Sequence, residues 1–410
     1  MSAAIPATML LDPAVLDDPC PFYERLRTEA PVWRVPGTDV FVASTFEMVA
    51  DATARVQDFS SNMRYLLYRD EAGLPARLSF GGDTGVQTLA TADPPIHAIH
   101  RGVVFPDLMA KRMTSLEPDV EKIVDGCIAR ALAEEHTEFM DTVGNAVPIT
   151  VISQLIGFQG SNPAVLLQNA FDSTLIVGVT VSLDQLGELI TKTGEIGAWI
   201  VEQLAAVADA PGDDLLGTVA RGVADNAMTL DEAVVTLQTL LSAGGESTTS
   251  LIGNAVRILA ERPDLQGELR EHPELLSAFV EEVLRLESPF RHHLRWIPQD
   301  TTLGDMHLPA ESSLLLFWGS ADRDPAEYEA ADQVVLDRAS LRHHVAFGRG
   351  IHHCVGAPLA RLEARIVLTA LLARTSNIAL DPARPPQRVE SLMVRRHETL
   401  PIIVTPARRA

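Results

Sequence analysis

One cysteine, Cys354, lies in a segment rich in glycine and histidine, GRGIHHCVGAP. The glycines around it, among them Gly350 and Gly356, favour a tight loop that can approach a ligand closely. Pro358 suits the first turn of a following helix, because its missing N–H is not needed there. The thiol would then stand at a helix N-terminus, where unpaired N–H groups and the helix dipole favour thiolate over thiol. A thiolate in such a loop is a good ligand for a soft or redox-active metal.

Two simpler interpretations of this loop stay open on the residues alone. A lone cysteine at the start of a helix is usually a small buried residue without a chemical role. Cys354 could also join nearby histidines in a zinc site, although their spacing matches no standard zinc pattern. The histidines in question are His343, His344, His352 and His353.

A second segment, LLSAGGESTTS, interrupts what is otherwise the pattern of one long helix. Thr229 and Glu232 have the spacing of a capping box at its start, and Pro263 marks its end. A helix over residues 229–260 would be long enough to cross a whole domain. Its central glycines, Gly244 and Gly245, each cost about 1 kcal/mol relative to alanine. A carboxylate and several hydroxyls surround them, so this stretch needs an explanation other than helix stability.

The residues Phe347–Gly356 resemble the haem-binding signature of the cytochromes P450, F-G-x-G-x-H-x-C-x-G. Other parts of the family pattern follow in order. Glu282 and Arg285 match the E-x-x-R of a family helix, where the two side chains are neighbours at i and i+3. Arg338 would complete the glutamate–arginine–arginine network. The resemblance extends over essentially the whole chain, and it implies haem b with Cys354 as its axial thiolate.

The resemblance also implies which residues bind the two haem carboxylates. His97 and Arg101, in ADPPIHAIHRGVV, match family positions that contact a propionate. Arg295 and His352 resemble the other propionate contacts, and Arg291 is a weaker alternative to Arg295. Two carboxylates in a buried site need cationic partners, because an unpaired buried charge is very costly. Without the resemblance, His97 and Arg101 would read as a solvated helix face.

The segment Ala243–Thr248 resembles the family's A-G-x-D/E-T-T, in which the central helix bends over the haem to make a groove for dioxygen. In this alignment Glu246 is the acid and Ser247 the alcohol that together supply protons. Thr248 follows directly, and a shift of one residue would make Thr248 the alcohol and Ser247 the residue at the acid position. A third interpretation is that these polar side chains only satisfy one another inside the helix.

The family implies a mainly α fold with small β-sheets, with haem buried between the long central helix and the cysteine loop. We expect a single haem domain over residues 1–410, with residues 1–15 flexible. The implied reaction is monooxygenation of an apolar small molecule, with electrons from a separate ferredoxin and ferredoxin reductase, since no flavin or nicotinamide motif is visible. Alternatives are a peroxygenase, a non-oxygenating isomerase or dehydratase, and a haem-binding sensor without turnover.

Charge and composition narrow the class of partner and compartment. Net charge is −22, with 33 basic against 55 acidic residues, which argues against nucleic acid or an anionic membrane surface as partner. The three cysteines are far apart, which indicates no disulfide framework. The N-terminus lacks the features of a signal peptide and no apolar run could span a bilayer, so we expect a cytoplasmic protein.

Periodicity predicts helices over residues 120–135, 148–157, 187–208, 229–260, 273–286 and 358–374. Short strands are predicted in VWRVPG, DVFVAS, TTLGDMHLP, SSLLLFW and PIIVT, and a turn in DAPGDD. The segment FDSTLIVGVTV falls where the family covers its pocket, and its lack of basic residues is compatible with an apolar ligand. For the electron donor we expect a basic patch on the cysteine side of the molecule, made of Arg349, Arg361, Arg365, Lys111 and Arg112.

Overall fold

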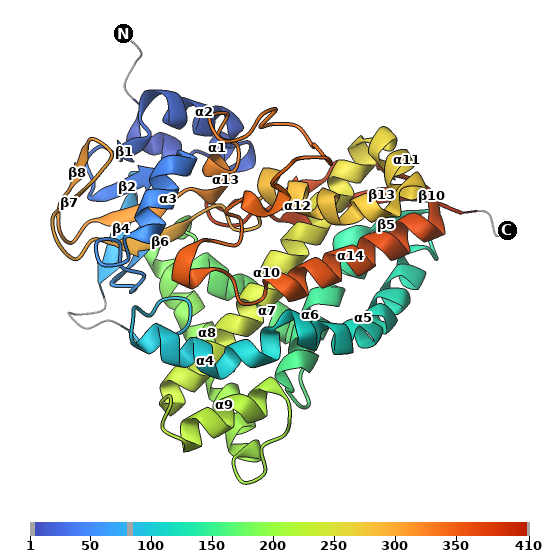
Figure 1. The fold of residues 1–410 in the computed structure, drawn as a ribbon, viewed down its shortest axis with the longest axis horizontal. Helices are drawn as coiled ribbons and strands as arrows, with labels where there is room; N and C mark the ends of the chain where they lie inside the picture. The colour runs from blue at the N-terminus through green and yellow to red at the C-terminus, as the bar shows by residue number, and fades with distance from the viewer. Residues whose placement is uncertain (1–4, 80–84, 408–410) are drawn as a thin grey trace.

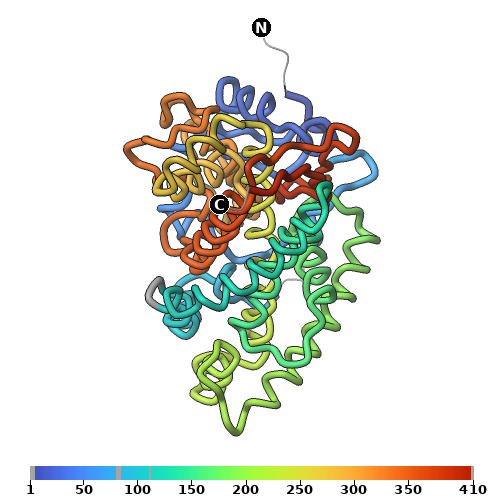
Figure 2. Tube along the Cα trace, turned by 90° about the vertical axis from the view of Figure 1, so that its right-hand side faces the viewer, coloured from blue at the N-terminus to red at the C-terminus, as the bar shows by residue number. Residues whose placement is uncertain are grey.

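A helix of 32 residues, α10 (Leu230–Glu261), runs through the centre of the molecule (Figures 1 and 2). The computed structural model describes residues 5–79 and 85–407. The predicted capping box is present: the Glu232 N–H donates to Thr229 Oγ1 at 3.2 Å, and the Thr229 N–H donates to Glu232 Oε2 at 2.7 Å. The helix ends where Pro263 follows Arg262, as the sequence predicts. Its length and burial make α10 the element against which the others pack.

Helices α6, α7, α8 and α14 pack directly on α10. The main helices besides α10 are α2 (Cys20–Glu29), α3 (Phe46–Ala54), α4 (Ile96–Leu108), α5 (Ala110–Ala131), α6 (Ala146–Ile156), α7 (Pro163–Ile176), α8 (Leu183–Val207), α9 (Leu215–Ala224), α11 (Pro263–Glu271), α12 (Leu276–Leu286) and α14 (Ala357–Arg374). Shorter helical turns are η1 (Ala7–Leu11), α1 (Pro13–Asp17), the π-helix η2 (Met140–Gly144), η3 (Pro273–Leu275), α13 (Trp318–Ala321), η4 (Leu341–His343) and η5 (Gly350–His352).

The six helices predicted from periodicity are confirmed, with α5 beginning ten residues before the predicted start at residue 120. Helix α7 was not predicted, and its buried face explains why. That face contains Asn169, Asp172 and Thr174 beside Leu166 and Ala170, so the apolar pattern that marks a helix is broken by polar residues that point inward. The predicted turn in DAPGDD separates α8 from α9, as expected.

The strands form small sheets at the edges of the helical body. The largest has the order β1-β2-β9-β6, with β2 and β9 parallel and the other pairs antiparallel. Its strands are β1 (Val32–Arg34), β2 (Val40–Ala43), β6 (His293–Trp296) and β9 (Ser313–Leu316). A second sheet has the order β10-β13-β5, from β5 (His136–Glu138), β10 (Thr375–Leu380) and β13 (Pro401–Pro406). Hairpins join β3 (Tyr65–Arg69) with β4 (Pro75–Ser79), β7 (Thr301–Leu303) with β8 (Met306–Leu308), and β11 (Gln387–Arg388) with β12 (His397–Thr399).

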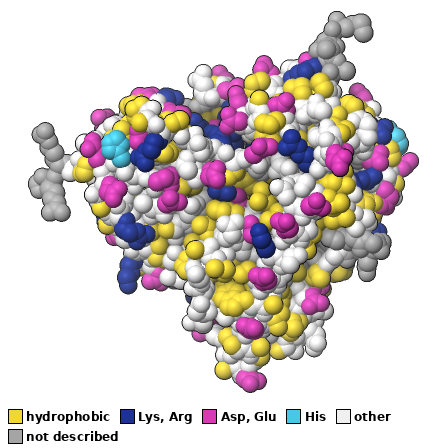
Figure 3. All heavy atoms as spheres, turned by 180° about the vertical axis from the view of Figure 1, so that it is seen from behind, with side chains coloured by type: hydrophobic (Ala, Val, Ile, Leu, Met, Phe, Trp, Pro, Cys, Tyr) yellow, Lys and Arg dark blue, Asp and Glu magenta, His cyan; other side chains and the backbone are white. Residues whose placement is uncertain are grey.

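The five predicted strand segments are all present, and together with the helices they confirm a mainly α fold with small sheets. On the rear face, acidic and basic side chains are interspersed, and apolar side chains gather toward the end that holds α9 (Figure 3). No helix in the part of the chain that the structure describes is long and apolar enough to cross a membrane.

The N-terminal segment differs from the expectation of a flexible stretch over residues 1–15. Residues 1–4 lie outside the described part of the chain, but the following residues form η1 and the start of α1. Leu10 and Leu11 of η1 are buried against Trp33 and neighbouring apolar side chains. Apolar burial therefore holds this segment against the body, an effect that the sequence pattern of so short a helix does not reveal.

Candidate active site

The loop before α14 presents the sulfur of Cys354 to backbone N–H groups. Gly348 and Gly350 have φ of +67° and +70°, a conformation that favours glycine. A Cβ on Gly350 would also come within 3.1 Å of the Thr53 carbonyl oxygen. The Cys354 N–H donates to the Phe347 carbonyl at 2.9 Å, which closes the loop. The sulfur then accepts from the N–H groups of Gly356 and Ala357 at the head of α14.

Two opposing effects act on the Cys354 thiol. Burial raises its pKa, while the two backbone N–H groups and the guanidinium groups of Arg361 and Arg101 lower it. The thiolate is therefore stabilised by its own loop but still needs a positive partner on its open side, which a bound metal ion supplies. No group of three or more His, Cys, Asp or Glu that could hold a metal occurs among the described residues, so the zinc interpretation has no ligand set.

A group of basic side chains lies near the cysteine loop with few acidic partners. The rings of His97 and His352 are in contact, with centroids 4.3 Å apart. His97 is buried, and its Nε2 has no hydrogen-bond partner among the described residues. Arg101 donates from Nη1 to the His353 carbonyl at 2.9 Å, which ties α4 to the loop. His97, Arg101 and His352, which lie far apart in the sequence, thus come together on one side of Cys354.

Arg295, on β6, is a buried cation without an anionic partner among the described residues. It is 8% exposed, and its one described hydrogen bond runs from Nη1 to the neighbouring Leu294 carbonyl at 2.8 Å. No described carboxylate lies within 4 Å of its guanidinium group. Burial lowers the pKa of Arg295 to about 10, and Asp93 offsets this only in part. Because an arginine keeps its charge in proteins, this site calls for an external carboxylate.

Arg291, the weaker alternative, points elsewhere. It is buried against the N-terminal segment, where its Nη1 donates to the Leu16 carbonyl at 3.0 Å. Arg295 instead borders a cavity beside α10 and Arg291 does not, so Arg295 is the better placed of the two to contact a ligand there. The donor set fits haem b: one sulfur at a helix N-terminus, and unpaired buried basic groups for two carboxylates.

His293 belongs to the same group and was missed by sequence reasoning. Its Nδ1 accepts from the Trp318 indole N–H at 2.6 Å, and indole is a donor only. His293 borders the open cavity, yet the surrounding protein, with Arg295 beside it, lowers the pKa of His293 to about 3. The ring is therefore neutral and carries its proton on Nε2. It stands two residues before Arg295 on β6, and alternate residues of a strand share a face. This spacing relative to Arg295 is the signal in the sequence that could have identified His293.

A cavity of about 360 Å³ lies between α10, α7 and β6. Ala243 and Ser242 of α10 border it, together with Arg295. The segment predicted to cover the pocket does so, through Ser173, Thr174, Ile176, Val177 and Val179. No Asp, Glu or Lys occurs among the described residues that line the cavity, and its lining is a mixture of apolar and neutral polar side chains.

Glu246 is buried inside the fold with two partners from distant parts of the chain. Its Oε1 accepts from Arg396 Nε at 3.1 Å, and its Oε2 accepts from the Thr174 hydroxyl. Burial raises the pKa of Glu246, and Arg396 and Thr174 offset this only in part. Since Thr174 also lines the cavity, a hydrogen-bonded path leads from Glu246 to the cavity wall. Neither partner was identified from the sequence.

The two glycines of α10 lie against neighbouring helices. The helix is continuous through them, and both face neighbouring helices. A Cβ on Gly244 would lie 3.0 Å from Ile152 Cγ1 of α6, and one on Gly245 would lie 3.4 Å from Ala170 Cβ of α7. The bend of α10 over the haem stays a prediction, and the glycines have a second effect. They allow α6 and α7 to approach α10 closely.

Ser247 and Thr248 face different surroundings on α10. The Ser247 hydroxyl donates to the Ala243 carbonyl at 2.6 Å, and Ala243 borders the cavity. Thr248 is four residues after Gly244, so both lie on the same face of α10, the face that packs on Ile152. Thr248 is 3% exposed, and none of the described hydrogen bonds involves its hydroxyl. The geometry favours Ser247 as the hydroxyl nearer the cavity.

The network around Glu282 has the geometry that the sequence indicated. Arg285 binds Glu282 with two N–H···O contacts of 2.9 Å, and Arg338 adds contacts of 3.0 and 3.3 Å. The Val335 N–H donates to the same carboxylate at 2.9 Å. Arg285 also donates to the carbonyls of Asp322 at 2.9 Å and Gln333 at 2.8 Å. Every donor here is directed at protein, which marks the network as structural.

Known proteins resemble this chain over nearly its full length. The family model for cytochrome P450 matches residues 212–400. Cytochrome P450 144 of Mycobacterium tuberculosis is 40% identical over 407 residues, which cover 98% of this chain and 93% of that protein. The cytochrome P450 monooxygenase PikC of Streptomyces venezuelae is 32% identical over 377 residues, covering 89% of this chain and 85% of that protein.

A solved structure extends the likeness to the fold. CYP109E1 of Bacillus megaterium, in complex with testosterone, superposes with a TM-score of 0.85 at 26% identity, covering 96% of this chain and 99% of that one.

Proposed function

This chain belongs to the cytochrome P450 family, and from that premise we propose that Cys354 is the axial thiolate of its haem b. The protein is a haem-thiolate monooxygenase, an oxidoreductase that inserts one atom of dioxygen into a small-molecule substrate. When bound, haem b supplies the reductive activation of dioxygen. The observation that carries the assignment is the Cys354 sulfur, which accepts two backbone N–H groups at the head of α14. Neither Cys20 nor Cys127 has such a loop.

We assign the haem carboxylates to the basic side chains beside the loop, His97, Arg101, Arg295 and His352. The unpaired charge of Arg295 and the unpartnered Nε2 of His97 support this assignment, because Arg295 needs an acceptor and His97 Nε2 needs a hydrogen-bond partner that the described residues do not provide. His293, with its Nε2 proton fixed by Trp318, is a further donor on the same strand face as Arg295. These residues hold and orient the group without taking part in the chemical step.

Glu246 and Ser247 would transfer protons at the cavity. Glu246 holds a proton more readily than an ordinary glutamate, because burial raises its pKa, and Thr174 connects it to the cavity wall. Ser247, on the face of Ala243, is the hydroxyl that would pass the proton on. Thr248 keeps the smaller role of filling space against α6.

The substrate class follows from the lining of the cavity. An ammonium group would find no carboxylate among the described lining residues, and apolar side chains such as Leu66, Ile176 and Met393 cover much of the wall. A neutral, largely apolar molecule therefore fits best, with hydroxyl and amide side chains such as Gln238 to orient it. The related CYP109E1 forms a complex with testosterone, which is a molecule of this general chemistry.

Electrons would come from a separate ferredoxin and ferredoxin reductase in the cytoplasm, with residues 1–410 acting as one haem domain. The basic patch predicted as the docking surface on the cysteine side contains fewer free cations than expected. Arg361 binds Glu281 with contacts of 2.7 and 2.9 Å, and Arg365 binds Glu117, so both are already neutralised. The Lys111 side chain lies outside what the structure describes. Arg349 and Arg112 remain as exposed cations for a negatively charged partner.

The test is the spectrum of the reduced protein with carbon monoxide, which reports thiolate ligation through the absorption band that names the family. Wild type, Cys20→Ser and Cys127→Ser should give this band, and Cys354→Ser should lose it. A Cys354→Ser protein that keeps the band would show that another sulfur is the ligand. A screen for compounds that shift the Soret band of the wild type then identifies substrates, and we expect neutral apolar compounds to shift it more than ammonium-bearing analogues.

A further inference from the structure

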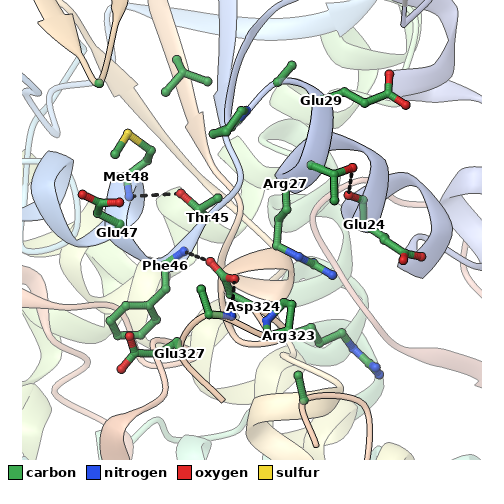
Figure 4. Close-up of a pocket in the computed structure, with 18 of the residues that line it drawn as sticks. Glu24, Arg27, Glu29, Thr45, Phe46, Glu47, Met48, Arg323, Asp324 and Glu327 are labelled. Atoms are coloured by element: carbon green, nitrogen blue, oxygen red, sulfur yellow. Dashed lines mark hydrogen bonds between the residues drawn. The ribbon is translucent and has the colours of Figure 1, made fainter. Parts of the chain in front are cut away.

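Buried carboxylates of this protein are held in two different ways. Asp324, in the wall of a groove between α2, α3 and the segment after α13, accepts from two backbone N–H groups, each at 3.0 Å (Figure 4). Such donors are fixed by the fold itself. The two hydrogen bonds to the Glu246 carboxylate come from the side chains of Arg396 and Thr174, and none of the described bonds to it comes from a backbone N–H. The surroundings of Glu246 therefore depend on what holds those two side chains.

Arg396 has few hydrogen bonds that could fix its position. It is 9% exposed and directly precedes β12. Its Nε donates to Glu246 Oε1 at 3.1 Å, and its other described hydrogen bond runs from Nη1 to the His397 carbonyl at 3.5 Å, near the limit for such a bond. Arg285, in contrast, binds Glu282 through two parallel N–H groups. A single N–H donor does not fix the plane of a guanidinium group as a bidentate pair does.

The ring of Phe171 supplies the restraint that these hydrogen bonds lack. The guanidinium carbon of Arg396 lies 3.7 Å from the centroid of the Phe171 ring. The next closest arginine–aromatic contact among the described residues is 4.5 Å, between Arg361 and Phe347. A cation over the face of an aromatic ring is attracted by the negative potential there, most strongly where water is excluded. Because Arg396 is buried, Phe171 holds the guanidinium group from one face while its Nε edge is directed at Glu246.

Helix α7 therefore controls both partners of Glu246. Phe171 and Thr174 are three residues apart on α7, so they lie on the same face of that helix. The Thr174 hydroxyl donates to Glu246 directly, and Phe171 acts through Arg396. The close approach of α7 to α10 at this point depends on Gly245, since a Cβ there would lie 3.4 Å from Ala170 Cβ.

We propose that Phe171 is a positioning residue for proton delivery, because its ring holds the Arg396 guanidinium group against Glu246. This inference rests on the proposed role of Glu246 in proton transfer. Phe171 is not among the described residues that line the cavity, so it acts through Arg396 and does not touch a substrate there.

Arg396 is the one charged group that acts on the Glu246 carboxyl among the described residues. Burial raises the pKa of Glu246, and the charge of Arg396 is the largest effect that opposes burial. His397, beside Arg396, is neutral because burial lowers its pKa to about 2. On α7, Asp172 accepts from Gln168 at 2.8 Å, and α6 contains no charged residue. Loss of the Phe171 ring should therefore let Arg396 move away, and the Glu246 carboxyl should then hold its proton to higher pH.

The first test is a crystal structure of the haem-loaded Phe171→Leu variant, which keeps an apolar side chain of similar size but has no ring. We expect Arg396 Nε to lie beyond hydrogen-bond distance of Glu246 Oε1. An Arg396 side chain that stays in place would overturn the proposal.

The second test follows the proton on Glu246 directly, by infrared titration of the haem-loaded protein. The carbonyl stretch of the protonated carboxyl group is assigned to Glu246 by its loss in Glu246→Gln. In Phe171→Leu this band should persist to higher pH than in wild type, and product formed per electron should fall a few-fold. Phe171→Tyr, which keeps the ring, should titrate like wild type.

Two further variants separate positioning from general packing. Leu167, one turn before Phe171 on α7, packs against the apolar core and has no described contact with Arg396. Leu167→Ala should therefore lower stability and leave the titration unchanged. Arg396→Met should shift the band as Phe171→Leu does, and the double variant should shift it no further, because both changes remove the same contact. If Leu167→Ala shifts the band as far as Phe171→Leu, or if the two shifts add in the double variant, the positioning role is refuted.

The inference and the proposed function fail in different ways. If Glu246→Gln keeps wild-type turnover, Glu246 has no role in proton delivery and the inference fails with it. If Glu246→Gln loses turnover but the band in Phe171→Leu titrates as in wild type, the proposed function stands and the inference alone is wrong.

Discussion

Glu282 and Glu246 are both buried glutamates, but their surroundings differ. Glu282 is 0% exposed and receives five N–H donors, from two arginines and one backbone group. Burial alone would raise its pKa, yet the bonds from Arg285 and Arg338 outweigh burial and hold the pKa of Glu282 below its ordinary value. Glu246 has one arginine and one hydroxyl, and burial keeps its pKa raised.

The same type of side chain thus serves two purposes in one molecule. A carboxylate that is fully paired stays charged, resists protonation and joins parts of the chain. A carboxylate that is only partly paired keeps the raised pKa that burial gives it, so it holds a proton more readily than an ordinary glutamate and can take one up and release it. Pairing, more than burial, separates the structural glutamate from the one we assign to proton transfer.

The largest expected effect comes from Glu282→Ala. Removing this carboxylate leaves Arg285 buried without its partner, which should cost about 3–5 kcal/mol, enough to abolish folding or haem retention. The measurement is the yield of soluble haem-loaded protein together with the urea midpoint. A Glu282→Ala protein that folds with full haem and merely turns over slowly would contradict the structural role.

Glu246→Gln should fold with haem, because glutamine keeps an oxygen that accepts from Arg396, at a cost of about 1 kcal/mol. Product formation should fall by about 10²-fold, since an amide does not exchange protons. A variant that keeps wild-type turnover would remove Glu246 from proton transfer.

The pH dependence of stability distinguishes the two glutamates further. Because the pKa of Glu246 is raised on folding, its contribution to stability is full at low pH and is lost as pH rises through the folded value. Because the pKa of Glu282 is lowered, its contribution is present above the unfolded value and is lost as pH falls. Comparing urea midpoints of wild type and Glu246→Gln across pH should show the variant losing less stability as pH rises.

A smaller effect separates Ser247 from Thr248. Ser247→Ala should divert electrons into hydrogen peroxide and lower product per electron a few-fold, because Ser247 lies one turn after Ala243, which borders the cavity. Thr248→Ala should leave this coupling nearly unchanged and lower stability instead. The measurement is the ratio of product to electrons consumed, with peroxide assayed in parallel. The reverse result would assign the hydroxyl role to Thr248, and no change in either would exclude this segment from proton delivery.

The smallest effect concerns surface charge, where pairing again decides the role. Reversing Arg349 and Arg112 together should slow ferredoxin-supported turnover by up to about tenfold at low salt, with the difference fading as salt screens it. Reversing Arg361 should instead lower stability, because it breaks the contact with Glu281. An unchanged salt dependence in the Arg349 and Arg112 variant would place the docking surface elsewhere.

Much of the fold could be predicted because its signals are local. The capping box at Thr229, the proline at residue 263 and the glycine loop before α14 each lie within a few residues of the feature they specify. Cys354 and the Glu282–Arg285 pair could be found in the same way. Helix α7 escaped because it buries polar side chains, and Leu10 and Leu11 lie in a helix too short to give a pattern.

The partners of the functional groups could not be predicted, because they are distant in sequence. Arg396 is 150 residues from Glu246, and Thr174 is 72 residues from it. The tautomer of His293 depends on Trp318, 25 residues away. The packing of Gly244 and Gly245 could not be predicted for the same reason, since only the packed structure reveals Ile152 and Ala170 opposite them.

The contacts of Arg291 and Arg395 with the N-terminal segment also bear on how the protein is synthesised. Arg395 Nη1 donates to the Asp17 carbonyl, 378 residues earlier in the chain, and Arg291 donates to Leu16 in the same segment. At about 5–20 residues per second, a ribosome needs roughly 20 to 75 s to make the second partner after the first. During that interval the apolar side chains of η1 and α1 have no completed surface to cover. We therefore expect the newly made N-terminal segment to depend on chaperones until the region around Arg395 leaves the ribosome.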